Sequence, residues 1–92
     1  MDIDGYVKFL EDQNLSTNGI ATRKRMLQET YSYIGKNLDE VVSNDNEMYY
    51  ALIKLQDIDN RAHTPRQNAL RKYYIFKNNK EFPRLKNYRP KS

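Results

Sequence analysis

Apolar residues recur every three or four positions along four stretches of this 92-residue chain. That spacing places them on one face of a helix, and no stretch alternates with a period of two for long, so we expect no sheet. The first predicted helix begins beside Asp2 and Asp4, whose carboxylates favour the positive end of a helix dipole. Its apolar stripe consists of Ile3, Tyr6, Val7 and Leu10.

The second predicted helix runs from about residue 17 to about residue 35. It follows Ser16, the first of three consecutive residues that favour the N-cap position, and Gly35 provides a stop. The side chains expected to face inward are those of Ile20, Leu27, Tyr31 and Ile34.

The third predicted helix follows a short stretch over residues 38–42. Asn44 and Glu47 have the spacing of a capping box and mark its start. Its expected core residues are Met48, Ala51, Leu52 and Leu55.

A polar loop over residues 57–63 leads to the fourth predicted helix. Thr64 followed by Pro65 marks its start, because Pro at the first helical position loses no hydrogen bond. The helix is expected to reach about Asn79, while residues 80–92, with two prolines and five basic residues, read as a linker or tail. The side chains that should face inward are Ala69, Leu70, Tyr73 and Phe76. The predicted fold class is all-α, a compact four-helix domain over residues 1–79 with a basic tail over residues 80–92.

Charge is divided unevenly along the chain. Residues 1–60 hold six Lys or Arg and eleven Asp or Glu, whereas residues 61–92 hold ten Lys or Arg and one Glu. Clustered basic groups bind polyanions because they displace counterions from phosphates, so the charge predicts a surface that faces nucleic acid. The alternative is a solvated basic tail without a partner.

The composition argues against several other classes of protein. The chain contains no Cys, no apolar run of about 18 residues and no signal-peptide pattern, so we expect a cytoplasmic protein without disulfides. His63 is the only His and lies in a predicted loop, and no glycine-rich phosphate loop is present. The sequence therefore favours a binding module over an enzyme, with no cofactor and no metal ion.

The fourth predicted helix carries a candidate DNA-binding face. Gln67, Arg71, Tyr74 and Asn78 fall on the side away from its apolar stripe. Gln, Asn and Arg have forked donors and acceptors that match base edges, and an outward Tyr74 suits a phosphate or a base. An ordinary solvated face is the alternative.

The second predicted helix adds a basic triplet over residues 23–25. Arg25 should point away from the apolar stripe, whereas Arg23 and Lys24 flank it. Hydroxyl and amide groups near the helix start can meet phosphate. The complete set of predicted DNA-binding residues is Thr17, Asn18, Thr22, Arg25, Gln67, Asn68, Arg71, Lys72, Tyr74 and Lys77.

Three runs of residues also follow one another in an order typical of a known family. The first joins residues 6–10 to residues 15–20, the second spans residues 38–41, and the third spans residues 68–76. In these runs the chain resembles the N-terminal core-binding domain, a SAM-like helical domain, of tyrosine recombinases of the phage integrase type. The resemblance covers about residues 4–83. The chain departs from the family pattern at Gly19, Arg23 and Met26, where Thr, Tyr and Asp are usual.

The resemblance implies a role in DNA integration and recombination. Such a domain forms half of a clamp around duplex DNA, with its second and fourth helices along the grooves. Catalysis belongs to a separate C-terminal domain, and none of its catalytic positions is present in this chain. The implied partners are double-stranded DNA, the catalytic domain of the same parent chain and other recombinase protomers. The alternative function is a small helical module that docks on an acidic protein partner.

Overall fold

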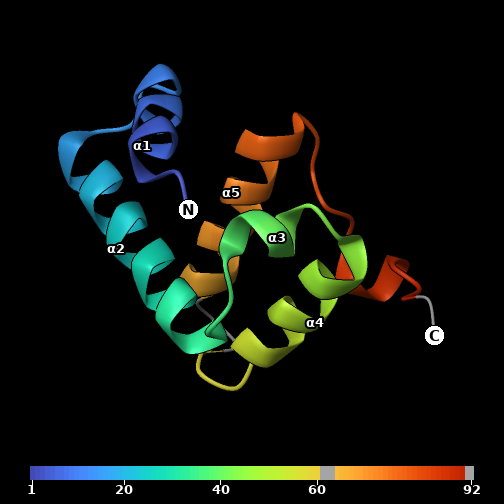
Figure 1. The fold of residues 1–92 in the computed structure, drawn as a ribbon. Coiled ribbons are helices and arrows are strands. Elements are labelled where there is room, and N and C mark those ends of the chain that lie inside the picture. Colours follow the sequence, from blue (N-terminus) through green and yellow to red (C-terminus); the bar gives the residue numbers. More distant parts are fainter. Residues whose placement is uncertain (61–63, 91–92) are drawn as a thin grey trace.

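Five α-helices and a short 3₁₀ helix form the part of the chain that the computed structural model describes, residues 1–60 and 64–90. The elements, shown in Figure 1, are α1 (Ile3–Asp12), α2 (Thr17–Ile34), α3 (Leu38–Val42), α4 (Asp45–Leu55), α5 (Pro65–Asn78) and η1 (Leu85–Asn87). No strand occurs within these ranges, which confirms the predicted all-α class. No helix in the same ranges is long and apolar enough to cross a bilayer.

Helices α1, α2 and α4 begin next to short polar residues that the sequence placed near their starts. The Asp2 side chain accepts a hydrogen bond from the Gly5 amide, and the Ser16 hydroxyl accepts one from the Gly19 amide. The Asn44 side chain accepts from two amides at the start of α4. These bonds satisfy backbone donors that have no partner within the helix, so short polar side chains fix where each helix begins.

The start of α5 is capped by a residue of the loop that precedes the helix. Pro65 is its first residue, as predicted, but the Thr64 side chain makes no capping bond. Instead, Asp59 Oδ2 accepts a hydrogen bond of 3.0 Å from the Gln67 amide. The side chain of Asp59 is completely buried and also pairs with Arg66 at 3.1 Å. Asp59 therefore holds the loop after α4 against α5.

The apolar core lies where the five α-helices meet. Each contributes at least one fully buried Leu, and all four core residues predicted for α4 are buried. One core prediction for α2 is wrong, because Tyr31 leaves 43% of its surface exposed while Thr30 is buried. The Thr30 hydroxyl lies 2.8 Å from the Met26 carbonyl oxygen and 3.4 Å from that of Arg66. This small side chain lets the first turn of α5 pack closely on α2.

Residues 38–42, which the sequence left without a helix, form α3. Asn37 caps this single turn by accepting a hydrogen bond from the Asp39 amide, and Leu38, Val41 and Val42 are buried. In Figure 1, α5 runs through the middle of the molecule, with α2 on one side and α3 and α4 on the other. Helix α5 is therefore packed on two sides.

The C-terminal segment is part of the folded domain, in contrast to the tail predicted over residues 80–92. Phe82 leaves only 4% of its surface exposed and packs its ring 5.3 Å from that of Tyr74. Tyr88 stacks on Tyr49 of α4 at 5.4 Å and donates a 2.6 Å hydrogen bond to Asn46. These aromatic contacts bury apolar area that α4 and α5 would otherwise expose, so the domain extends past residue 79 to at least Tyr88.

Two buried tyrosines near α1 differ in how their hydroxyl groups are satisfied. The Tyr6 hydroxyl is buried without a hydrogen-bond partner among the described residues, and burial raises its pKa to about 12, although the nearby charge of Arg23 opposes this rise. The Tyr73 hydroxyl accepts a 2.9 Å hydrogen bond from the Asp2 amide and donates one to Asp39. Of these two hydroxyls, only that of Tyr73 connects separate elements.

We predict that removing these two hydroxyls has unequal effects. Tyr6→Phe should leave the free energy of unfolding unchanged or slightly higher, because the buried hydroxyl has no bond to lose. Tyr73→Phe should lower it by about 1–2 kcal/mol, since two partners lose their bond. Urea denaturation of both variants measures the difference, and equal losses in the two would contradict the prediction.

A second prediction concerns the C-terminal segment. Phe82→Ala should lower the free energy of unfolding by about 3 kcal/mol, because it leaves a cavity beside Tyr74 and Tyr88. Lys86→Ala, at an exposed position of the same segment, should change it by no more than about 0.5 kcal/mol. If both variants unfold at the urea concentration of the parent, the segment does not stabilise the domain.

Candidate nucleic-acid interface

Two helical segments without any acidic residue pack against each other. Helix α5 contains no Asp or Glu, and neither does α2 before Glu29. Between them lies a hollow of about 380 Å³. It is lined by Asn18, Gly19, Thr22, Arg23 and Met26 from α2 and by Pro65 and Asn68 from α5. This part of the surface combines polar and basic groups, and no carboxylate is among the residues that line the hollow.

Three of the predicted DNA-binding residues meet at this hollow: Asn18, Thr22 and Asn68. All three are exposed, as is Thr17 at the first position of α2. Arg23 lines the same hollow, although the sequence placed it only at the edge of the apolar stripe. The absence of Asp and Glu on either side of the basic triplet in the sequence could have identified Arg23 as part of the site.

The exposed side of α5 differs from the one that its sequence predicted. Asn68, Arg71, Lys72 and Ile75 lie on one side of the helix, away from the buried Ala69 and Tyr73. We call Asn18, Thr22, Arg23, Asn68, Arg71 and Lys72 together the α2–α5 face. Among the ion pairs of the described residues, none involves Arg23 or Lys72. Their charges are therefore available to an external anion.

Tyr74, predicted to point outward, is buried. Its hydroxyl donates a 2.9 Å hydrogen bond to Asp45, and burial together with this bond raises its pKa to about 12. Asn78, four residues after Tyr74 on the same side of α5, donates a 3.0 Å hydrogen bond to the Val42 carbonyl oxygen. The prediction is wrong because this side of α5 packs against α3, α4 and the C-terminal segment.

Gln67 was predicted on the same side of α5 as Tyr74 and Asn78, and its side-chain amide is already hydrogen-bonded to Asp59. Gln67 Nε2 lies 3.3 Å from Asp59 Oδ2, which also accepts from the Gln67 backbone amide. The side chain is half-buried. Gln67 therefore supports the loop after α4, and Asn68 is the exposed amide at the start of α5.

Arg71 is held by backbone carbonyl groups. Its Nη1 donates to the carbonyl oxygens of Phe82 and Pro83 at 2.9 and 3.3 Å. Burial lowers the pKa of Arg71; the charge of Glu81 opposes this effect, and that of Arg84 adds to it. The Arg71 guanidinium forms no ion pair among the described residues, so the segment fixes its position while Glu81, which lines a hollow together with Arg71, offsets part of its charge.

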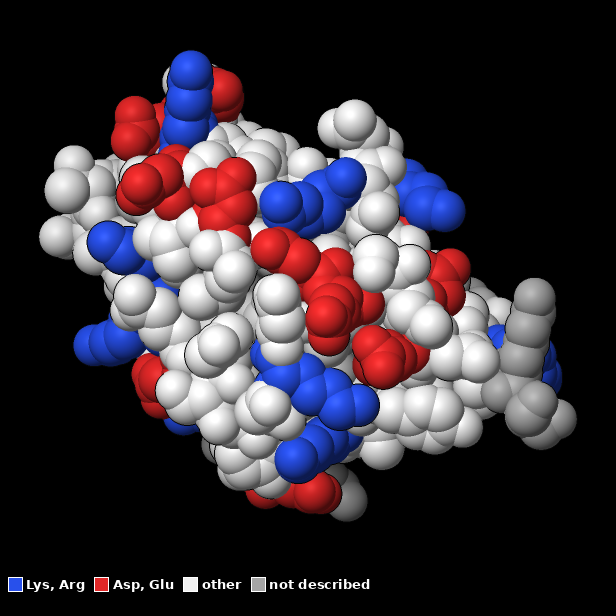
Figure 2. Space-filling model, in the orientation of Figure 1, with Lys and Arg blue, Asp and Glu red and all other residues white. Residues whose placement is uncertain are grey.

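Lys77 lies on another side of α5 and does not join the α2–α5 face. Its Nζ is 3.6 Å from Asp39 Oδ1 and 5.4 Å from the ring centroid of Phe76. Figure 2 shows acidic side chains gathered over α3 and the start of α4, where Asp39 lies. The expectation that Lys77 shares a surface with Arg71 and Lys72 is therefore wrong.

Arg25 points outward as predicted, with 69% of its side chain exposed. Its Nε lies 3.9 Å from Glu29 Oε2, one turn further along α2. Arg25 is thus close to the α2–α5 face, but a carboxylate partly offsets its charge.

Asp39 of α3 has three partners. It accepts the Tyr73 hydroxyl, and its carboxylate lies 3.5 Å from the Met1 amino group and 3.6 Å from Lys77. Burial raises the pKa of Asp39, but the Tyr73 bond and the two positive charges outweigh it and lower the pKa below its ordinary value. The folded state thus favours the ionised carboxylate.

This lowered pKa predicts how stability depends on pH. Asp39 stabilises the fold at pH values above its ordinary pKa of 3.8, and the contribution is lost as pH falls through the lower folded value. At about pH 7, Asp39→Asn should lower the free energy of unfolding by about 1 kcal/mol. The loss is small because solvent partly screens the site. Urea denaturation at about pH 7 and about pH 2.5 should show that difference shrinking. A constant difference would contradict the prediction.

Within residues 1–60 and 64–90, no group of three or more His, Cys, Asp and Glu side chains is arranged to hold a metal ion. His63, the only His, lies outside the described residues.

Comparison with known proteins adds no family assignment. No known family model matches the sequence, and neither the curated proteins nor the solved structures give a match. The functional argument therefore starts from the surface itself.

Proposed function

We propose that this chain is a duplex-DNA-binding module that contacts the DNA backbone with its α2–α5 face. The observation that carries the proposal is the juxtaposition of two acid-free helical segments, on which Arg23 and Lys72 have no ion-pair partner among the described residues. Phosphates gain most from basic groups that no nearby carboxylate already neutralises.

The polar residues of the face divide into two roles. Arg23, Arg71 and Lys72 pair with phosphates, and the Thr22 hydroxyl adds a hydrogen bond to the backbone. Asn68 is the best candidate for a base edge, because an exposed amide can pair with adenine through both its donor and its acceptor. We do not assign this role to Gln67, because its amide is hydrogen-bonded to Asp59.

We further propose that the module serves a site-specific recombinase of the tyrosine class. The support is the sequence resemblance, together with the fact that the two helices it assigns to DNA grooves are those that form the α2–α5 face. Catalysis then resides in a C-terminal domain whose catalytic residues this chain lacks. A single module that supplies half of a clamp binds DNA modestly and with a strong dependence on salt.

Neutralising two cations of the face tests the proposal. The double variant Arg23→Gln, Lys72→Gln should bind a fluorescent generic duplex about tenfold more weakly at low salt. Its plot of log affinity against log salt concentration should be shallower by about two, one for each lost phosphate contact. Fluorescence anisotropy at several salt concentrations measures both effects, and circular dichroism verifies that the variant remains folded.

The double variant Lys36→Gln, Lys54→Gln is the matched control. It removes the same charge from another surface, where Lys36 pairs with Glu47 and Lys54 lies over the Tyr33 ring. Its binding should stay within about twofold of the parent. Equal losses in the two double variants would refute the α2–α5 face. A parent chain that binds no duplex at low salt would refute DNA binding and favour the docking of an acidic protein partner.

A further inference from the structure

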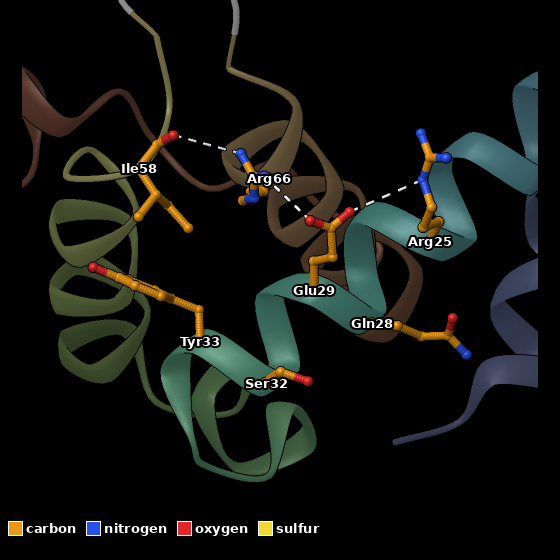
Figure 3. A pocket seen from close by; sticks show the side chains of 7 residues that line it. All are labelled: Arg25, Gln28, Glu29, Ser32, Tyr33, Ile58 and Arg66. Carbon is orange, nitrogen blue, oxygen red and sulfur yellow. Dashed lines mark hydrogen bonds and ion pairs between the residues drawn. The ribbon is translucent and has the colours of Figure 1, made fainter.

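A second hollow, of about 580 Å³, lies further along α2 and contains an unusual bridge (Figure 3). Glu29 stands between two guanidinium groups. Its Oε1 is 3.2 Å from Arg66 Nη2, and its Oε2 is 3.9 Å from Arg25 Nε. One carboxylate thus occupies the position between two arginines that a phosphate group would fit.

Arg66 is held in place independently of Glu29. Its Nη1 donates to Asp59 Oδ1 at 3.1 Å and lies 3.5 Å from the Ile58 carbonyl oxygen. Asp59 is completely buried and caps α5, so this anchor persists when the other side of the guanidinium changes partner. Arg66 is therefore positioned in advance for an anion.

Glu29 is the replaceable member of the cluster. Its side chain is 42% exposed, and it makes no contact comparable to the cap that Asp59 provides. Arg25 is more exposed still and is free to turn toward a ligand. An anion that approaches from solvent can thus take the place of the Glu29 carboxylate between the two guanidiniums.

The hollow adjoins the α2–α5 face along α2. Arg25 follows Thr22 by three residues of α2, so their side chains are neighbours on the helix surface, whereas Arg66 faces the hollow from the first turn of α5. A DNA backbone that follows α2 beyond Thr22 therefore meets Arg25 at the edge of this hollow. The charges of Glu29 and Asp59 offset those of the two arginines, so the hollow attracts a phosphate only weakly.

We infer that Arg25 and Arg66 form a phosphate site that the Glu29 carboxylate occupies in the free protein, and that a DNA phosphodiester displaces it on binding. This inference rests on the proposed DNA binding. Glu29 then limits the affinity for DNA, because the phosphate must replace the ion pairs that Glu29 makes with the two arginines.

Glu29→Gln tests the inference, because the amide keeps the shape and a hydrogen-bond acceptor for Arg66 while it removes the charge. The variant should bind a generic duplex about fivefold more tightly at about 50 mM salt, with a salt dependence steeper by about one. Glu47→Gln is the control, since Glu47 is equally exposed at 40% and pairs with Lys36 at 3.6 Å. It changes the net charge by the same amount and should leave affinity unchanged.

A double-mutant cycle and a phosphate titration complete the test. Arg25→Gln alone should weaken duplex binding by no more than about twofold, whereas added to Glu29→Gln it should remove the gain. Inorganic phosphate should shift the NMR signals of the Arg25 and Arg66 side chains more strongly in Glu29→Gln than in the parent. An unchanged affinity of Glu29→Gln, or an equal gain in Glu47→Gln, would overturn the inference while leaving DNA binding intact. If the parent binds no duplex, the proposed function fails, and the phosphate titration alone decides whether the anion site exists.

Discussion

The fold depends on the packing of α5 on both of its sides. On one side, Thr30 of α2 receives the first turn of α5, and Asp59 and Arg66 fix that turn to the preceding loop. On the other, Tyr73 and Tyr74 reach Asp39 and Asp45 on α3 and α4. These buried tyrosines use their rings for apolar packing and their hydroxyls to bind carboxylates at the core's edge. The strip of α5 between these two packed sides carries Asn68, Arg71 and Lys72.

Local chemistry predicted most of the fold. The period of apolar residues gives α1, α2, α4 and α5, and short polar side chains such as Ser16 and Asn44 fix where helices begin. The predictions that failed depended on contacts between segments that are distant in the sequence. A wheel drawn for α5 distinguishes its most apolar side, but it cannot show that a second side, with Tyr74, is covered by Phe82. Likewise, the single turn of α3 has too few residues to display a period.

The candidate site was predictable in part for the same reason. Exposed polar residues such as Asn18, Thr22 and Asn68 follow from helix periodicity, so their position on the surface could be anticipated. The partners of charged residues could not, because ion pairs between distant segments depend on how the helices pack. Lys77 pairs with Asp39 and Arg66 with Glu29 and Asp59, all separated widely along the chain or by a loop.

Opposite charges on two sides of α5 also affect how the molecule moves before any contact forms. Acidic groups on α3 and the start of α4 (Figure 2), together with basic groups on the α2–α5 face, give the domain an electric dipole moment. In the field of a polyanion, such a particle rotates during diffusion so that its positive end leads. Encounters are thereby biased toward productive orientations, and dissolved ions weaken this torque over about one Debye length.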